Sequence, residues 1–189
     1  HMSTGLSGAD LQDLNSGGIM VSANNTTGSV WEWDADSSVW TNPSLTGNTE
    51  TTGYAIYGGT ESGNAFLSST TGGVVLDITG TPKTGTVSAG LKYNDGQSTS
   101  VTFAGGTDMP ATEGWNLLAN PYLSNYDWDN STKQHGINAY YVYNGTNYLT
   151  RSGGVGAAGQ YIAPGQGIFL QVSGQTNGWT GSLDFSSAQ

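Results

Sequence analysis

Cysteine and basic residues are the scarcest components of this chain of 189 residues. There is no cysteine, so there is no disulfide framework, and a chain of this length can bury roughly 70% of its unfolded surface without one. The formal net charge is −10, and the positive side chains are only Lys83, Lys92, Lys133 and Arg151. Because binding to a phosphate backbone depends on clustered Lys and Arg, this balance argues against nucleic acid as a partner. It also disfavours acidic membranes and heavily sulfated polysaccharides.

Long apolar runs and helical periodicity are also lacking. No run approaches the roughly 18 apolar residues of a membrane-spanning helix, so we expect no membrane insertion. Only residues 3–17 carry leucines at near-helical spacing, and there we expect a short helical turn or an edge segment. His1-Met2 is typical of a cloning remnant, so the fold prediction leaves it out.

Aromatic residues, threonine and turn-forming residues are abundant instead, with 30 Gly, 6 Trp and 10 Tyr. Disordered segments are poor in aromatics, whereas threonine and aromatic rings favour strands and Gly and Asn favour turns. The composition therefore predicts an all-β fold of short antiparallel strands, a β-sandwich or jelly-roll-like module. The clearest strand segments are Gly18–Val21, Val30–Trp33, Val39–Trp40, Gly53–Tyr57, Val74–Ile78, Thr86–Leu91 and Ser100–Phe103. Val30–Trp33 and Val39–Trp40 flank a polar loop and predict a hairpin.

The second half of the chain echoes the first. Trp31-Glu32-Trp33 followed by Trp40 parallels Tyr141-Val142-Tyr143 followed by Tyr148, and each aromatic pair precedes a strand that starts with glycine. A single hairpin unit cannot bury its own aromatic face, so we expect the two units to share one core. After a tag and N-terminal segment at residues 1–17, we predict one module over residues 18–189, with pseudo-symmetric halves at about 18–105 and 106–189.

Three motifs in order carry a resemblance to a known class of protein. They are Gly114-Trp115-Asn116-Leu117-Leu118-Ala119-Asn120-Pro121-Tyr122, then Ala139–Gly145, then Tyr161-Ile162-Ala163-Pro164-Gly165-Gln166-Gly167-Ile168-Phe169. Over residues 50–172 the chain resembles the β-modules of secreted, multi-domain surface proteins of Bacteroidetes, which have GWNLxxNPY and PGQGxF motifs and often precede a C-terminal secretion-sorting domain. The resemblance implies a secreted or cell-surface location and covalently linked neighbouring domains.

Aromatic rings beside amide and carboxylate turns are the first candidate site. Sugar-binding modules stack flat rings on pyranose faces and bond the hydroxyls through Asn, Gln, Asp or Glu. The candidate ligand-binding residues are Trp31, Trp33, Trp40, Tyr126, Trp128, Tyr148 and Trp179. The alternative is that these rings fill a core that is short of aliphatic residues, because burying one large ring removes about 150–250 Å² from water.

Two acidic turns are the second candidate site. Asp34 and Asp36, and likewise Asp127 and Asp129, place carboxylates at alternating loop positions, as calcium ligands are often placed. Asp and Asn also cap turns through their own backbone, which is the alternative. We therefore expect no cofactor except a possible calcium ion.

Catalytic residues are not expected. His135 is the only histidine besides His1, and it lies in a loop context without a nucleophile motif. The leading hypothesis is a non-catalytic, extracellular carbohydrate-binding module of a larger secreted enzyme or adhesin, with a neutral or weakly charged polysaccharide or cell-surface glycan as its partner. The runner-up is a structural or adhesive spacer without a small ligand. Ice binding by Thr-rich strands is a third hypothesis, and an enzyme hypothesis would gain only from a cleft with two close carboxylates.

Overall fold

The structure is a computed structural model that describes residues 1–3, 5–9, 11, 30–44, 46–47, 50–56, 60–62, 65–67, 79–93, 101–102, 108–109 and 114–186. In these ranges the predicted all-β class is confirmed, because the elements are antiparallel strands and none is an α-helix. The strands predicted at 18–21 and 74–78 lie outside the described residues. Within the described part of the chain, no helix has the length and apolar character needed to cross a membrane.

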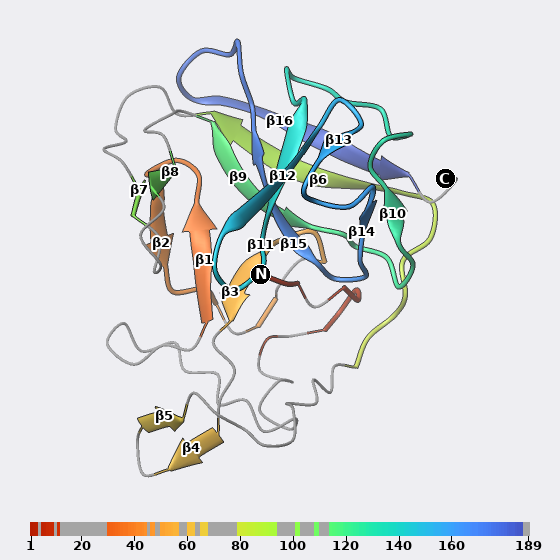
Figure 1. Cartoon of the computed structure of the whole chain (residues 1–189). Helices are drawn as coiled ribbons and strands as arrows, with labels where there is room; N and C mark the ends of the chain where they lie inside the picture. The colour runs from red at the N-terminus through yellow and green to blue at the C-terminus, as the bar shows by residue number, and fades with distance from the viewer. Residues whose placement is uncertain are drawn as a thin grey trace.

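A five-stranded sheet with the order β13-β12-β11-β15-β9 forms the centre of the molecule (Figure 1). Its strands are β9 (Trp115–Ala119), β11 (Ala139–Tyr143), β12 (Tyr148–Ser152), β13 (Val155–Gly156) and β15 (Gly167–Gln171). All five residues of β9 are buried, and so are the first four of β15. Strands covered on both faces have near-continuous apolar sequences, which explains why the residues of β9 and β15 do not alternate between polar and apolar.

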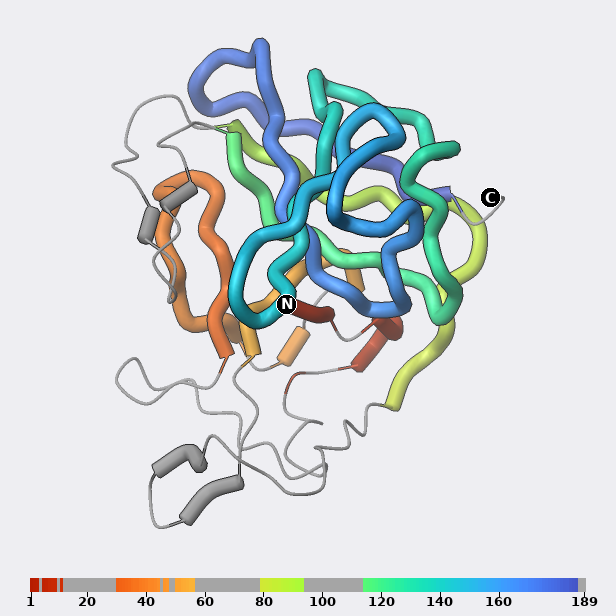
Figure 2. Tube along the Cα trace, in the orientation of Figure 1, coloured from red at the N-terminus to blue at the C-terminus, as the bar shows by residue number. Residues whose placement is uncertain are grey.

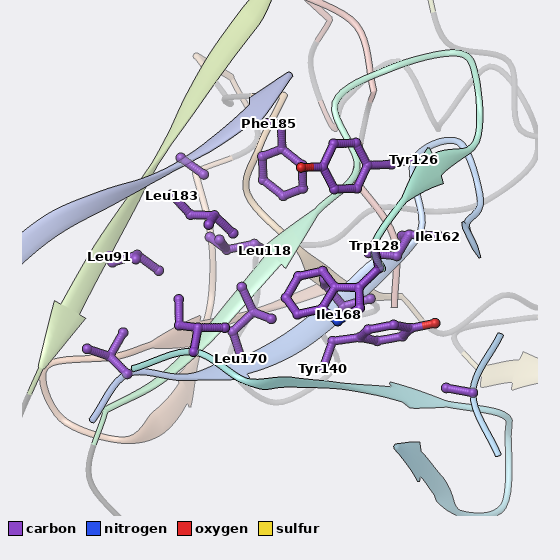
Figure 3. Packing of buried hydrophobic residues seen from close by; sticks show 14 of the residues in the cluster. Leu91, Leu118, Tyr126, Trp128, Tyr140, Ile162, Ile168, Leu170, Leu183 and Phe185 are labelled. Carbon is purple, nitrogen blue, oxygen red and sulfur yellow. The ribbon is translucent and has the colours of Figure 1, made fainter. Parts of the chain in front are cut away.

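One face of this sheet is covered by a two-stranded ribbon of β6 (Thr86–Tyr93) and β16 (Trp179–Ser186). In β6 the buried Ala89 and Leu91 alternate with the exposed Ser88 and Gly90, the period of a strand with one wet face. Figure 3 shows the resulting core, in which residues of the ribbon meet residues of the sheet. Its labelled members are Leu91, Leu118, Tyr126, Trp128, Tyr140, Ile162, Ile168, Leu170, Leu183 and Phe185.

A second, smaller core lies on the opposite face of the sheet. The hairpin of β1 (Val30–Asp34) and β2 (Val39–Thr41) packs there, joined by β3 (Tyr54–Ile56) on the other side of β1. The core consists of buried Trp33, Ala35, Trp115, Leu117 and Phe169, with Trp40, Tyr141 and Tyr148 packed against it. The predicted hairpin is therefore confirmed, and its aromatic residues cover the back of the central sheet.

The two halves of the chain have a similar strand register, and the internal repeat stays a prediction. The order β2-β1-β3 in the first half matches β12-β11-β15 in the second. The facing pairs are Trp33 with Trp40 and Trp31 with Ala55 in the first half, and Tyr143 with Tyr148 and Tyr141 with Phe169 in the second. Gly53 and Gly167 then take equivalent positions, two residues before Ala55 and Phe169. Both halves thus build an aromatic hairpin followed by a glycine-led third strand.

The remaining strands are short. β10 (Tyr126–Asp127) pairs with β14 (Tyr161–Ile162) beside the larger core, β4 (Thr60–Ser62) pairs with β5 (Ala65–Leu67), and β7 (Val101–Thr102) pairs with β8 (Asp108–Met109). In the N-terminal segment, Ser7 forms an antiparallel bridge with Thr81, and Leu11 is fully buried. The described part of that segment therefore includes the edge pairing that was one of its two predicted forms.

The asparagines of the Gly114–Tyr122 motif hold the layers together. The Asn116 side chain accepts a hydrogen bond from the backbone N–H of Lys92 at 2.9 Å and donates to the carbonyls of Lys92 and Gly114. It therefore joins the edge of β6 to β9. The Asn120 amide donates to the carbonyls of Ser124, Ile162 and Ala163, and its carbonyl accepts from the Tyr122 N–H. Both buried amides have their hydrogen-bonding groups satisfied by backbone, so the motif serves the fold.

His1 and Met2, which the fold prediction left out, are both hydrogen-bonded within the fold. Residues 1–3 run as an extended segment between β3 and the start of β15 (Figure 2), and Met2 forms antiparallel bridges with Tyr54 and Gln166. The first residues of the chain thus link the two sheets.

Candidate functional site

Three of the seven candidate rings lie in the cores. Trp33, Tyr126 and Trp128 are exposed by 7%, 4% and 2%. Trp33 packs edge-on against Trp40 and Phe169, and Trp128 packs edge-on against Tyr140. A ring that stacks on a sugar needs an open face, so the structure argues against a stacking role for these three rings and supports the alternative that they fill the core.

The other four candidate rings, Trp31, Trp40, Tyr148 and Trp179, are half-buried. The Tyr148 ring lies 5.9 Å from that of Phe169, and Trp40 and Tyr148 both contact the ring of His1. Trp179 lies 4.7 Å from the ring of His135, measured between ring centroids. The structure thus brings Trp33, Trp40 and Tyr148 together at one end of the smaller core and places Trp179 elsewhere, beside His135.

The acidic turns are occupied by protein donors. Asp34 accepts hydrogen bonds from the Asp36 N–H and the Ser37 hydroxyl, and Asp36 pairs with Lys92 at 2.5 Å. Asp127 accepts hydrogen bonds from the side chains of Asn130 and Gln160. Asp129 forms a bidentate ion pair with Arg151. Among the described residues, no group of three or more His, Cys, Asp or Glu side chains is placed to hold a metal ion. Calcium binding therefore stays a prediction, and the observed contacts are those of capped turns.

A cleft of about 690 Å³ lies where β1, β6 and the residues 50–52 meet β9. This volume is within the range of small-molecule sites. The side chains that supply its hydrogen-bonding groups are Glu32, Asp34, Thr41, Glu50, Thr51, Thr52, Ser88, Lys92, Asn116 and Thr180. Trp33, Leu117 and Leu118 add apolar lining. The cleft therefore combines hydroxyls and carboxylates with a limited apolar wall.

The local structure explains why these groups converge. On β1, Glu32 and Asp34 are two residues apart, so they share the strand face opposite to Trp33. Across the cleft, the exposed Ser88 and Lys92 of β6 belong to the wet face of the ribbon. The Asn116 amide ties Lys92 to β9 and so attaches the β6 wall of the cleft to the central sheet.

The cleft is acidic. Burial, then the neighbouring charge of Asp34, raises the pKa of Glu32, while Lys92 opposes the shift. Burial acts to raise the pKa of Asp34, but hydrogen bonds from Ser37 and Asp36 and the charge of Lys92 lower it overall. The hydrogen bond to Asp36 raises the pKa of Lys92. Three carboxylates and one ammonium thus line the cleft. Among the carboxylates, only Glu32 has a raised pKa, so its negative charge is the least stabilised by its neighbours.

Sequence reasoning named Glu32 only in passing, because its position between two tryptophans was visible but its surroundings were not. The hydroxyls of Ser88 and Thr180 were missed altogether, and Thr51 was named only among the Thr-rich strands of the ice-binding hypothesis. They come from three distant segments, and a single sequence without pairing information contains no signal that brings them together.

Comparison of the chain with protein-family models, with curated proteins and with solved structures found no match.

Proposed function

We propose that the chain is a non-catalytic module that binds a neutral or weakly charged glycan in the cleft between β1, β6 and β9. The observation that carries the proposal is the lining of this cleft, where carboxylates and hydroxyls from separate segments converge around about 690 Å³. Sugar hydroxyls donate to carboxylates and exchange hydrogen bonds with Thr and Ser, so the lining supplies the partners that an oligosaccharide needs.

The charges of the cleft select the ligand class. Lys92 is paired with Asp36, and Lys83 is paired with Glu50 at 2.8 Å, so both cations near the cleft already have carboxylate partners. A uronic acid or sulfate would meet Glu32 and Asp34 without a free cation to balance it among the described residues. Neutral sugars avoid this repulsion, because a hydroxyl donates to a carboxylate without introducing a like charge.

Ring stacking has a smaller part in this proposal than in the sequence-based hypothesis. Trp33 lines the cleft but is only 7% exposed, so it offers little open ring surface for stacking. Orientation and affinity come from hydrogen bonds, with Leu117 and Leu118 adding the apolar contact.

The resemblance of the three motifs to Bacteroidetes surface modules supports a setting outside the cell. There the module would target a larger secreted enzyme or adhesin to polysaccharide, with neighbouring domains linked in the same chain. A chain without cysteine is compatible with this setting.

Affinity electrophoresis in gels with plant, algal and microbial polysaccharides tests the proposal. Wild-type protein is expected to be retarded by at least one neutral polymer, and Glu32→Gln and Thr51→Val are expected to weaken binding about tenfold, the value of one or two hydrogen bonds. Tyr161→Ala is the matched control, because Tyr161 is 54% exposed but lies outside the cleft. Absence of retardation on every polymer would overturn the proposal, and an effect of Tyr161→Ala alone would move the site to the surface rings.

A structural or adhesive spacer is the second candidate. The observation that favours it is the burial of Trp33, Tyr126 and Trp128, which gives these rings a packing role. In that case no polysaccharide retards the protein, and substitutions in the cleft change only stability.

A further inference from the structure

The first three residues occupy a slot between the two sheets. Figure 1 shows the N-terminus in the middle of the view, beside β3, β11 and β15. Met2 exchanges two backbone hydrogen bonds with Tyr54, at 2.9 and 2.7 Å. On the other side, the Ser3 N–H donates to the Gly165 carbonyl at 2.8 Å, and the Gly167 N–H donates to the His1 carbonyl at 2.9 Å. Residues 1–3 therefore act as a short strand with partners on both sides.

The slot exists because the pairing between β11 and β15 covers only part of β15. β11 pairs with β15 at Tyr140–Leu170 and Tyr141–Phe169, and no further pair follows within these strands. If the same register continued, Tyr143 would face Gly167. Instead the Gly167 N–H is taken by His1, so the entering segment uses the edge of β15 that β11 leaves unpaired.

Gly167 fits this arrangement. A Cβ atom at this position would lie 2.6 Å from the His1 Cβ and 2.9 Å from the Met2 nitrogen. Any side chain at residue 167 would therefore collide with the segment in the slot. The glycine that starts β15 leaves the space that the inserted backbone occupies.

The end of the slot is a box of aromatic rings. The His1 ring lies 5.4 Å from Phe169, 5.7 Å from Trp40, 5.9 Å from Tyr148 and 6.0 Å from Tyr143, between ring centroids. Yet the His1 Nδ1 atom is buried without a hydrogen-bond partner. A buried polar atom without a partner is unfavourable, so a purely hydrocarbon ring suits this box better than an imidazole does.

We propose that the slot between β3 and β15 is an acceptor site for an extended peptide strand with an aromatic residue at the position of His1, a site that residues 1–3 fill in this structure. Recognition by added strands works through backbone hydrogen bonds, with pockets for particular side chains supplying specificity. The four backbone bonds do not depend on which side chains the strand carries, and the box selects for a ring. Burial of the N-terminal amino group lowers its pKa, so an amide-linked or acetylated residue suits this position better than a free ammonium.

The test uses the full chain with the substitution Met2→Pro. Proline lacks the N–H that Met2 donates to the Tyr54 carbonyl. The substitution is therefore expected to release residues 1–3 from the slot and to leave the slot itself intact. The probe is a fluorescent peptide, acetyl-Phe-Met-Ser-Thr-Gly, compared with the versions that start with His and with Ala. The Met2→Pro chain is expected to bind the Phe peptide most tightly and the Ala peptide about tenfold more weakly, the effect of losing aromatic contacts. The wild-type chain is expected to bind all three poorly, because its own strand competes.

A folded Met2→Pro chain, verified by circular dichroism, that binds none of the peptides at millimolar concentration would overturn the proposal. Equal binding of the Phe and Ala peptides would overturn the role of the box. If Met2→Pro fails to fold, the proposal is tested instead by the melting temperatures of the His1→Phe and His1→Ala variants. The proposal requires His1→Phe to melt at or above wild type and His1→Ala below it, and three equal values contradict it.

Discussion

The indole N–H of Trp33 donates a hydrogen bond to the backbone carbonyl of Trp115 at 2.8 Å, across 82 positions of sequence. This bond attaches the β1–β2 hairpin to β9 and so joins the two halves of the pseudo-repeat. The same indole forms part of the smaller core and of the cleft wall.

Trp33→Phe tests this bond. Phenylalanine keeps a ring in the core but removes the donor, which leaves a buried carbonyl unsatisfied. We expect a loss of about 2–3 kcal/mol in the free energy of unfolding, from the lost bond together with the lost ring volume. Urea unfolding followed by circular dichroism measures it. Trp31→Phe, on the same strand but half-buried, is the control and is expected to cost less than half as much.

Asn116→Ala tests the tie between β6 and β9. The substitution removes the side-chain hydrogen bonds to the Lys92 N–H, the Lys92 carbonyl and the Gly114 carbonyl. The Gly114 carbonyl still accepts from the Val172 N–H. We expect a loss of about 3 kcal/mol, because each unsatisfied buried group costs roughly 1–3 kcal/mol and water replaces some of the lost bonds. The exposed Asn138→Ala serves as reference, with an expected change within about 0.5 kcal/mol. Equal stabilities of the two variants would contradict the role assigned to Asn116.

Gly114→Ala and Gly145→Ala distinguish two reasons why a position requires glycine, which are a positive φ angle and the lack of space for a side chain. Both residues have positive φ, +79° and +100°. A Cβ at Gly114 would lie 2.2 Å from the Val172 carbonyl oxygen, whereas one at Gly145 would meet nothing within 4 Å. We expect Gly145→Ala to cost about 1–2 kcal/mol through backbone strain alone. Gly114→Ala is expected to cost more than about 4 kcal/mol or to prevent folding, and thermal unfolding of the pair measures the difference.

Glu32→Gln should raise stability near neutral pH. The pKa of Glu32 is raised in the folded protein, so folding disfavours the charged form. This cost is absent below the ordinary pKa of glutamate, where Glu32 is protonated in both states, and it grows as the pH rises through the raised value. We therefore expect Glu32→Gln to be more stable than wild type at about pH 7 and equal to it at about pH 3. Urea unfolding at both pH values gives the comparison, and a variant less stable than wild type at pH 7 would contradict it.

Asp129→Asn should behave in the opposite way. The hydrogen bond from Arg151, and then the charge of Arg151, lower the pKa of Asp129. The stabilising contribution of such a group is present above the ordinary pKa of aspartate and is lost as the pH falls through the lowered value. Asp129→Asn is therefore expected to lower the melting temperature near neutral pH and to leave it unchanged in strong acid. A pH-independent difference between the two proteins would argue for a packing effect instead.

Local patterns predicted the all-β class and the β1–β2 hairpin, because each depends on neighbouring residues. Trp33 and Trp40 face each other across a short loop, and alternation along Thr86–Leu91 marks one wet face. The positions that sequence reasoning missed depend on long-range placement. Whether Trp33 or Trp31 is the buried ring is decided by Trp115 and Phe169, which are far away in sequence.

The candidate site shows the same limit. The acidic turns were visible as sequence patterns. Partners such as Gln160 for Asp127 and Arg151 for Asp129, however, lie 33 and 22 positions away in the sequence. The surroundings of His1 could not be predicted for a related reason. The sequence has no pattern that shows this ring among those of Trp40, Tyr143, Tyr148 and Phe169.

The edge of β9 that faces away from β15 is hydrogen-bonded to residues 51–53. The Gly53 N–H donates to the Leu117 carbonyl, and the Ala119 N–H donates to the Thr51 carbonyl. These two edge groups of the buried strand β9 are therefore hydrogen-bonded within the same molecule. Unpaired strand edges nucleate association between copies. Residues 51–53 cover part of this edge, which leaves less of it open to pairing with another copy.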